Sequence, residues 1–258
     1  MADATDALLL RAVPYRDADL IVTLLSRDLG KLSALARGAR RSSRRFGARL
    51  ALFTVGRAEL RARRGELWTL ASYDVVRDFT GLGGDVAAVA HGSYGLELVR
   101  ELTAFEQAEP AIFDLVVELF EALAARGASP SVLRAFELRL LELVGLAPEL
   151  DACIACGDAA ALAAAGTVLD GLRGGAVCAA CHAGASAKPL PPDALAALRA
   201  ARATTRLVDA PADGGAGAAA ARDALVAMVL AHVGKPLRSL EFIAKMSAPV
   251  VPSRHGDG

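Results

Sequence analysis

The sequence predicts an α+β protein, in which a small β-barrel precedes a helical region that carries an inserted four-cysteine element. Three observations lead to this class. Short apolar runs separated by turn residues fill residues 1–80, and apolar residues at helical spacing dominate residues 81–258. All four cysteines fall within residues 151–184. We therefore expect two domains, 1–80 and 81–258, with the cysteine element inside the second.

The N-terminal domain shows five runs of β-favouring residues. They lie at residues 7–13, 20–26, 31–36, 52–63 and 67–73, and the last two flank a turn at Arg64-Gly65. Five short strands in under about eighty residues fit a closed barrel, which removes exposed sheet edges. An oligonucleotide-binding (OB) barrel has this size, although periodicity alone does not separate it from an SH3-like barrel.

The rest of the chain is rich in alanine and leucine, which favours helix. Helices are expected at residues 85–103, 112–125, 132–144, 192–203 and 218–233, and Ser129-Pro130 is typical of a helix start. We expect the apolar stripes of these helices to form the core and their acids, such as Glu137 and Glu142, to face solvent. The low-complexity segment Ala210–Ala221 is expected to be mobile, and residues 247–258 to form a disordered tail.

Charge is segregated along a chain whose formal net charge is zero. Residues 1–80 hold fifteen Lys/Arg and nine Asp/Glu, whereas residues 81–152 hold four and twelve. Between Lys31 and Arg64 there are eleven basic residues and a single acid, Glu59. The acidic middle of the chain could face a basic surface of the same chain or of another.

A segment this dense in arginine indicates a polyanionic partner, and a nucleic-acid backbone is the most general one. The alternative is a solvated loop that has no partner. The candidate nucleic-acid-binding residues are Lys31, Arg37, Arg40, Arg41, Arg44, Arg45, Arg61, Arg63 and Arg64. The aromatic residues available for base stacking are Phe46, Phe53, Trp68 and Tyr73, and burial in the core is an equal alternative for each.

The cysteines form two CxxC pairs, Cys153/Cys156 and Cys178/Cys181. Two such pairs supply four thiolates to one tetrahedral ion, which predicts one structural Zn²⁺ with no open coordination position. A c-type haem, suggested by the CxxCH sequence ending at His182, would leave the first pair unexplained. A thioredoxin-like motif would need a flanking strand and helix, for which neither pair gives a clear pattern.

The sequence does not favour an enzyme. The four histidines are scattered, and Gly81–Gly84 lacks the Lys-Ser/Thr that a phosphate-binding loop requires. An uninterrupted apolar run of membrane-spanning length is absent from the sequence, and the N-terminus carries acids where a signal peptide has basic residues. We expect a cytoplasmic, nucleoid-associated protein without a membrane partner or a small-molecule substrate.

The chain resembles the bacterial RecO family of recombination mediators in DNA repair. The resemblance rests on ALLLRAVPYRDADLIVTLLSRDLGKLSALARGARRSSRRFGARLALF near the N-terminus, on FELRLLELVGLAPELDACIACG at 136–157 and on HVGKPLRS at 232–239. It implies an OB fold, a helical C-terminal domain with a zinc element, and binding and annealing of DNA strands without nucleotide hydrolysis.

The resemblance also implies partners. These are single- and double-stranded DNA, RecR, and the acidic, hydrophobic C-terminal tail of single-stranded DNA-binding protein, in a complex that helps to load RecA. Lys235 and Arg238 are candidates for binding the tail, although their segment could instead pack the domain. The alternative function is a zinc-stabilised scaffold that binds RNA or a protein and has no annealing activity.

Overall fold

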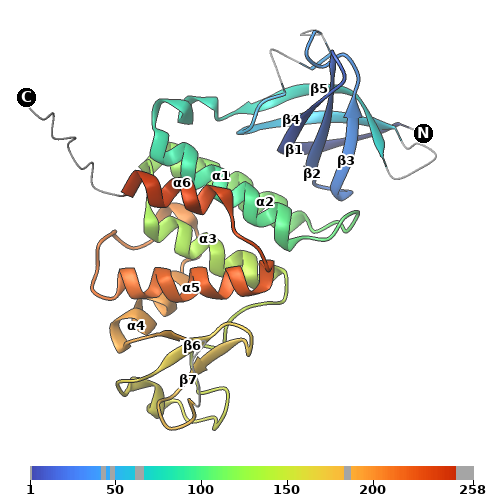
Figure 1. Cartoon of the computed structure of the whole chain (residues 1–258). Helices are drawn as coiled ribbons and strands as arrows, with labels where there is room; N and C mark the ends of the chain where they lie inside the picture. Colours follow the sequence, from blue (N-terminus) through green and yellow to red (C-terminus); the bar gives the residue numbers. More distant parts are fainter. Residues whose placement is uncertain (1, 42–44, 47–49, 62–66, 183–186, 248–258) are drawn as a thin grey trace, which may run out of the picture.

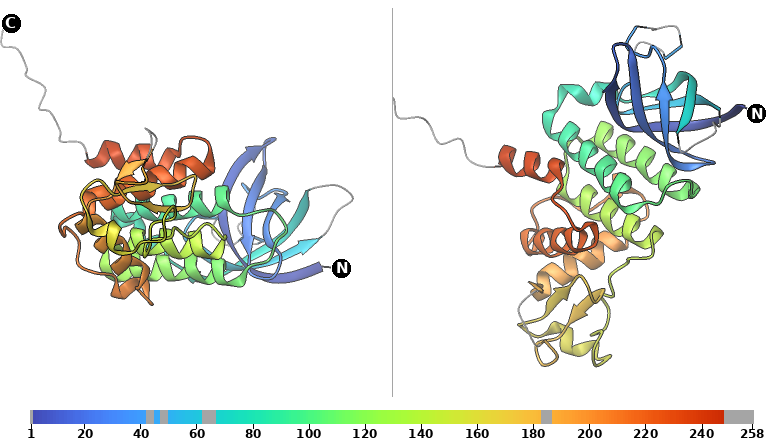
Figure 2. Two further views of the ribbon diagram at one scale, coloured as in Figure 1. Left: turned by 90° about the horizontal axis from the view of Figure 1, so that it is seen from below. Right: turned by 45° about the vertical axis from the view of Figure 1, so that its right-hand side comes forward.

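The structure is a computed structural model that describes residues 2–41, 45–46, 50–61, 67–182 and 187–247. Its outline is elongated, with the barrel at one end, the cysteine element at the other and the helices between them (Figure 1). A second direction of view gives the same arrangement (Figure 2, right). The predicted α+β class is confirmed.

The N-terminal barrel has five strands: β1 (Ala2–Tyr15), β2 (Asp19–Ser26), β3 (Gly30–Ala36), β4 (Thr54–Arg61) and β5 (Trp68–Asp78). They close in the order β1-β2-β3-β5-β4, and β4 pairs back onto β1. All neighbours are antiparallel except β3 and β5, which are parallel. This mixed five-stranded closure is OB-like.

Strand β1 is apolar on both faces, which explains the run Ala7–Leu10. Ala7 and Leu9 belong to the core inside the barrel. Leu8 and Leu10 point the other way and join the core shared with the helices. Because side chains alternate along a strand, this register lets one strand serve two cores.

The helical region contains α1 (Val86–Leu102), α2 (Pro110–Arg126), α3 (Pro130–Leu143), α4 (Pro192–Arg202), α5 (Ala218–Val233) and α6 (Arg238–Ser247), with short 3₁₀ turns η1 (Thr80–Gly84), η2 (Ala160–Ala163) and η3 (Leu207–Asp209). The Asp85 carboxylate accepts hydrogen bonds from two backbone N–H groups at the start of α1, and the Ser129 hydroxyl accepts one from Val132. The first five helices lie where the sequence predicts them. Helix α6 was not predicted.

The segment expected to be mobile is instead tied to the helices. Helix α5 begins inside it, at Ala218. Arg126 donates to the carbonyls of Val208 and Ala210, and the Asp213 carboxylate accepts from the Ser131 N–H at 2.7 Å. The bond from Ser131 satisfies a free N–H group at the start of α3. Beyond Ser247, the predicted tail lies outside the described residues.

The cysteine element contains a small antiparallel sheet of β6 (Val168–Asp170), β7 (Gly175–Val177) and β8 (Lys188–Pro189), in the order β7-β6-β8. Its inner residues Leu169 and Ala176 are buried in the core of the helical region. Among the described residues, none of the helices has the length and apolar character needed to cross a membrane.

Candidate nucleic-acid interface and metal centre

The loop that joins β3 to β4, residues 37–53, carries most of the arginine-rich stretch, and we call it the barrel loop. Gly38 has φ +68°, a backbone conformation that glycine adopts without strain, and its N–H donates to the Asp19 carboxylate at 2.8 Å. The next turn is held by the N–H of Arg40, which donates to the Ala18 carbonyl at 3.0 Å. The start of the loop is therefore fixed against the β1–β2 turn.

The middle of the barrel loop is anchored by Phe46, which is fully buried in the barrel core. Next to it, the Arg45 carbonyl accepts a hydrogen bond from the Tyr73 N–H at 2.9 Å, and the Arg45 guanidinium lies over the Phe46 ring at 5.4 Å. An apolar anchor next to Arg45 keeps this exposed arginine at the surface of the barrel.

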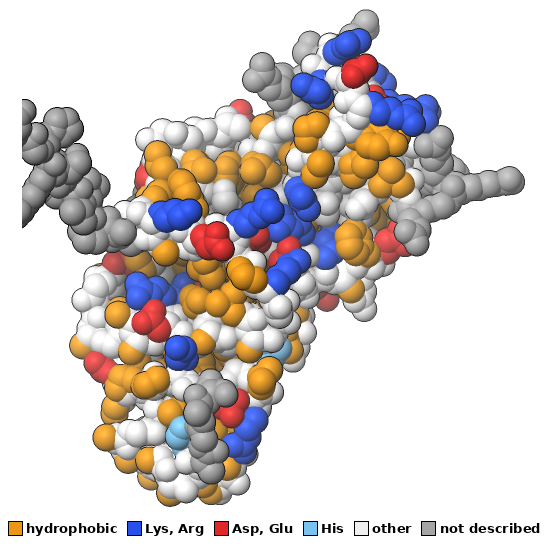
Figure 3. Space-filling model, viewed as in Figure 1, with side chains coloured by type: hydrophobic (Ala, Val, Ile, Leu, Met, Phe, Trp, Pro, Cys, Tyr) orange, Lys and Arg blue, Asp and Glu red, His pale blue; other side chains and the backbone are white. Residues whose placement is uncertain are grey.

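The described arginines of the predicted DNA-binding set are exposed. Arg37, Arg41 and Arg61 make no ion pair with any described acid. Within the described ranges, the guanidinium groups of Arg40 and Arg45 donate only to backbone carbonyls, those of Asp17 and Arg37. Arg44, Arg63 and Arg64 lie outside the described residues. Figure 3 shows Lys and Arg side chains gathered at the outer end of the barrel and again where the barrel meets the helices.

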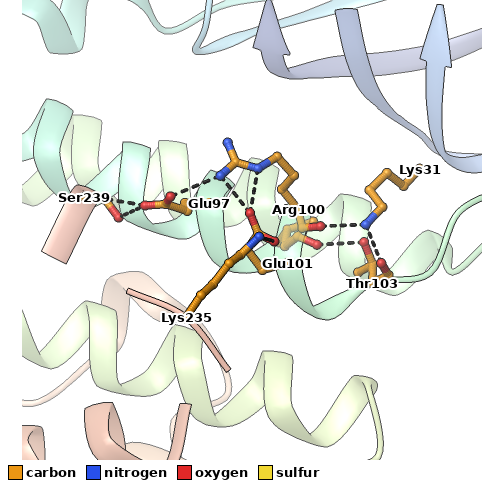
Figure 4. A network of polar contacts seen from close by, with 8 residues as sticks. Lys31, Glu97, Arg100, Glu101, Thr103, Lys235 and Ser239 are labelled. Atoms are coloured by element: carbon orange, nitrogen blue, oxygen red, sulfur yellow. Dashed lines mark hydrogen bonds and ion pairs between the residues drawn. The ribbon is translucent and has the colours of Figure 1, made fainter. Parts of the chain in front are cut away.

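Lys31 does not fit the predicted phosphate contact. Only 5 % of the residue is exposed, and its ammonium donates to the carbonyls of Arg100, at 2.6 Å, and Thr103 at the end of α1 (Figure 4). It also lies 4.5 Å from the centre of the Phe105 ring. Burial lowers the pKa of Lys31 from its usual value. A cation at a helix C-terminus satisfies free carbonyls, so Lys31 joins the barrel to α1.

The four aromatic residues considered for base stacking are mostly buried. Phe46 and Tyr73 are fully buried in the barrel, and Phe53 packs edge-on against Phe120 of α2 with ring centres 5.3 Å apart. Trp68 is half-buried and donates its indole N–H to Glu106 at 2.8 Å. The described part of the barrel therefore offers its arginines rather than these rings to a nucleic acid.

The four cysteines come together as the sequence predicts. Their Sγ atoms all lie within 4.8 Å of one another, and those of Cys156 and Cys178 are 3.9 Å apart. Tetrahedral coordination with Zn–S bonds of about 2.3 Å places sulfur atoms about 3.8 Å apart, so the donor set fits one metal ion. The four cysteines form one possible metal site.

Backbone N–H groups support this cluster. The Cys178 N–H donates to the Cys153 sulfur at 3.4 Å, which lowers the pKa of the Cys153 thiol to about 6. Gly157, at φ +75°, closes the first pair by donating its N–H to the Cys153 carbonyl at 2.8 Å. In the second pair, the N–H groups of Cys181 and His182 both donate to the Cys178 carbonyl. These turns are typical of metal-binding knuckles.

The segment of Lys235 and Arg238 belongs to a polar network on α1 (Figure 4). The Lys235 ammonium is paired with the Glu101 carboxylate at 2.7 Å. Glu97 accepts from both the N–H and the hydroxyl of Ser239, so an acid on α1 caps the start of α6. Lys235 thus has a packing role, whereas the Arg238 side chain is exposed and has no partner among the described residues.

Glu137 is fully buried, contrary to the expectation that it faces solvent. It accepts a hydrogen bond from the Tyr94 hydroxyl at 2.5 Å and pairs with Arg134 at 2.7 Å. Burial raises the pKa of Glu137 and lowers that of the neighbouring His91 to about 4. No local sequence pattern indicates this cluster, since its members come from two helices, α1 and α3.

The buried cluster lies at one side of a cavity of about 670 Å³. Its walls are mainly alanines and other small residues of α4, α5 and the 211–216 segment. The Arg134 Nε and the His91 Nδ1, although buried, have no hydrogen-bond partner among the described residues. Arg134 and His91 both line the cavity, so an apolar space is combined with unsatisfied polar atoms.

The OB-like barrel and the helical region with its four-cysteine cluster each match a family model of a DNA-recombination protein, which places the chain in the class of recombination and repair proteins. Family models of the N-terminal and C-terminal parts of recombination protein O match residues 1–79 and 83–241. The chain belongs to the RecO family.

Relatives named DNA repair protein RecO align over nearly the whole chain. The protein of Anaeromyxobacter sp. (strain K) is 42% identical, with 92% of this chain and 93% of the relative covered. Those of Myxococcus xanthus and Geobacter sulfurreducens are 37% and 38% identical, with 93% and 94% of this chain and 96% and 97% of the relatives covered. The two family models together span the barrel, helices α1 to α5 and the cysteine element.

Proposed function

We propose that this chain is a recombination mediator that binds single- and double-stranded DNA and anneals complementary strands coated with single-stranded DNA-binding protein. With RecR it would help to load RecA. Family membership implies DNA and RecR as partners. The observation that carries the proposal is the set of exposed arginines, Arg37, Arg41 and Arg61, that have no acidic partner among the described residues.

Unpaired guanidinium groups bind the phosphates of a nucleic acid, and the release of condensed counterions makes the free energy of binding favourable. Such contacts fix a strand in place without reading its bases, because phosphates are the same at every step. Binding without sequence preference suits annealing, in which two strands of any sequence must be held near each other. The same chemistry accommodates a duplex and a single strand.

Replacement of Arg37, Arg41 and Arg61 with alanine tests this interface. DNA binding should weaken for all sequences, and the salt slope of the affinity on single strands should fall by about 0.7 for each phosphate that is no longer bound. Fluorescence anisotropy at several salt concentrations measures both. Arg206→Ala removes an exposed arginine of the helical region and serves as the matched control. An unchanged salt slope of the DNA affinity in the triple variant would show that these arginines are not part of the DNA interface.

The annealing activity is tested with two complementary labelled oligonucleotides, one of them coated with cognate single-stranded DNA-binding protein. We expect the chain to accelerate annealing and the acceleration to fall steeply with salt. Intact DNA binding without any acceleration would instead favour the alternative function, a zinc-stabilised binding scaffold.

We further propose that the tail of single-stranded DNA-binding protein enters the alanine-lined cavity. An acidic, hydrophobic tail needs an apolar space and a cation, and the cavity combines small apolar walls with the unsatisfied Arg134 Nε. Lys235 and Arg238, the two residues that the sequence suggested for this role, line a different groove, and Lys235 is paired with Glu101. Arg134 is itself paired with Glu137, but its Nε–H has no acceptor among the described residues, and it lies beside the small apolar walls that a hydrophobic tail requires.

Ala196→Phe tests this site, since Ala196 is exposed and lines the cavity. The bulky ring should reduce binding of a labelled tail peptide and leave DNA binding unchanged. Ala124→Phe places the same ring on an exposed position of α2 away from the cavity. Equal peptide binding by both variants would contradict the assignment.

The ion held by the cysteines is proposed to be one structural Zn²⁺. Four sulfur donors leave no position for water or substrate, so the ion would hold the two pairs together without taking part in annealing. We expect one zinc per chain by mass spectrometry of the metal content. Cys153→Ser with Cys178→Ser should remove the zinc and unfold the cysteine element, whereas zinc retained in this variant would contradict the site.

A further inference from the structure

A second groove lies where the barrel meets the helical region, with a volume of about 720 Å³. One wall is formed by β1 and the end of the barrel loop, and the other by α1, the 235–237 segment and α6. The residues that matter here are Leu10, Arg11, Leu50, Leu52, Arg238 and Phe242. Leu50 and Leu52 continue the barrel loop directly into this groove.

The groove carries a net positive charge. Its two acids, Glu97 and Glu101, are bound by Arg100, Lys235 and Ser239 (Figure 4). Arg11 on the barrel wall and Arg238 on the α6 wall are exposed and make no ion pair with any described acid. Two free guanidinium groups on different walls suit a ligand that carries repeated negative charge along its length.

An exposed aromatic ring accompanies these charges. Phe242 lies one turn after Arg238 on α6, lines the groove, and is 45% exposed. A flat apolar surface next to a cation is the arrangement on which an unpaired base stacks while its phosphate is bound.

We propose that this groove is a second segment of the path of a single DNA strand. The strand leaves the barrel loop at Leu50, its phosphates bind Arg11 and Arg238, and one base stacks on Phe242. The inference rests on the proposed function, because the strand must first be held by the barrel. A duplex keeps its bases paired and offers none to Phe242, so the groove distinguishes a single strand from a duplex.

The test uses three variants: the double variant Arg11→Ala/Arg238→Ala, Phe242→Ala and Phe242→Tyr. The affinity of each for oligo-dT of increasing length is compared with that of the parent chain. For short strands, which the barrel alone accommodates, all variants should match the parent chain. For longer strands, the double arginine variant should lose affinity, and its salt slope should fall by about 1.4. Phe242→Ala should lose about five-fold or more, and Phe242→Tyr should retain the affinity because it keeps the ring.

Arg206→Ala again supplies an exposed arginine of the helical region as control. Unfolding midpoints of all variants check that α6 remains folded. The groove would be overturned if the groove variants kept their affinity for long strands while the Arg37/Arg41/Arg61 triple variant lost it; the proposed function would then still stand. If neither the groove variants nor the triple arginine variant lost affinity for DNA, both the groove and the proposed function would be overturned.

The same variants are measured with the acidic tail peptide of single-stranded DNA-binding protein. Unchanged peptide affinity is expected if the groove holds DNA. Loss of peptide binding in the Arg11/Arg238 variant, together with unchanged binding of long strands, would assign the groove to the peptide and overturn the inference. If Phe242→Ala reduced the affinity for a duplex as much as that for a single strand, the role of the Phe242 ring would be overturned.

Discussion

The barrel loop and the helical region hold their charged side chains in opposite ways. In the helical region, Glu137 is buried with Arg134, and Glu101 is held between Arg100 and Lys235. In the barrel loop, Arg37 and Arg41 are exposed without an acidic partner among the described residues. Charge therefore stabilises packing around α1 and α3, whereas the arginines of the barrel loop remain available to a ligand.

The boundary between the two regions uses charge for attachment. Arg27 pairs with Asp114 of α2 at 2.6 Å, Arg77 pairs with Glu121, and Trp68 donates to Glu106. Part of the excess acid in residues 81–152 thus faces the basic barrel of the same chain. The barrel therefore has one side that is neutralised by the helices and one side that stays basic.

The largest effect is expected from Glu137→Ala. The substitution leaves the Arg134 guanidinium and the Tyr94 hydroxyl buried without their shared partner, which should cost about 3–5 kcal/mol of unfolding free energy. Urea unfolding measures it. Glu142→Ala, which replaces an exposed acid further along α3, is the control and should change stability by less than about 0.5 kcal/mol. Equal losses of unfolding free energy at the two positions would contradict this contrast between a buried and an exposed acid.

A smaller loss is expected from Lys31→Ala. Two carbonyls at the end of α1 lose a charged donor, at a cost of about 2–3 kcal/mol, while the DNA affinity of the folded protein should stay the same. Arg37→Ala should show the reverse, with weaker DNA binding and unchanged stability. Both are followed by urea unfolding and fluorescence anisotropy. Weaker DNA binding by folded Lys31→Ala would show that Lys31 contributes to the DNA interface.

The smallest effect is a dependence on pH from His91. The unfolded chain protonates His91 near its usual pKa of 6.5, whereas the folded chain does so near about 4, because burial disfavours the charged ring. The contribution of neutral His91 to the free energy of unfolding is fully present above pH 6.5 and is lost as the pH falls toward 4.

Between pH 7 and pH 5 this loss should amount to about 2 kcal/mol. His91→Gln should reduce the difference in unfolding free energy between these two pH values by that amount. Glu137 remains in both chains, so its own titration cancels in the comparison. Parallel pH profiles for the parent chain and the variant would show that His91 is not the source.

Much of the architecture is determined by the sequence alone, because its signals are local. Alternation and turn residues predicted five strands, and helical spacing predicted five of the six α-helices found in the described part of the chain. The two CxxC pairs predicted one four-cysteine site. The arginine-rich stretch identified the barrel loop. Full-length family relationships agree with these local patterns.

Only the tertiary structure decided which charged residues are free, since their partners are remote in sequence. Lys31 and Arg37 belong to one basic stretch, yet the end of α1, about seventy residues away, receives only Lys31. Helix α6 depends on a cap from Glu97, 142 residues before Ser239, and ten residues alone form a marginal helix. Glu137 and Glu142 look alike in sequence, and only packing against α1 buries the first, because burial of a charge is decided by the neighbours that surround it.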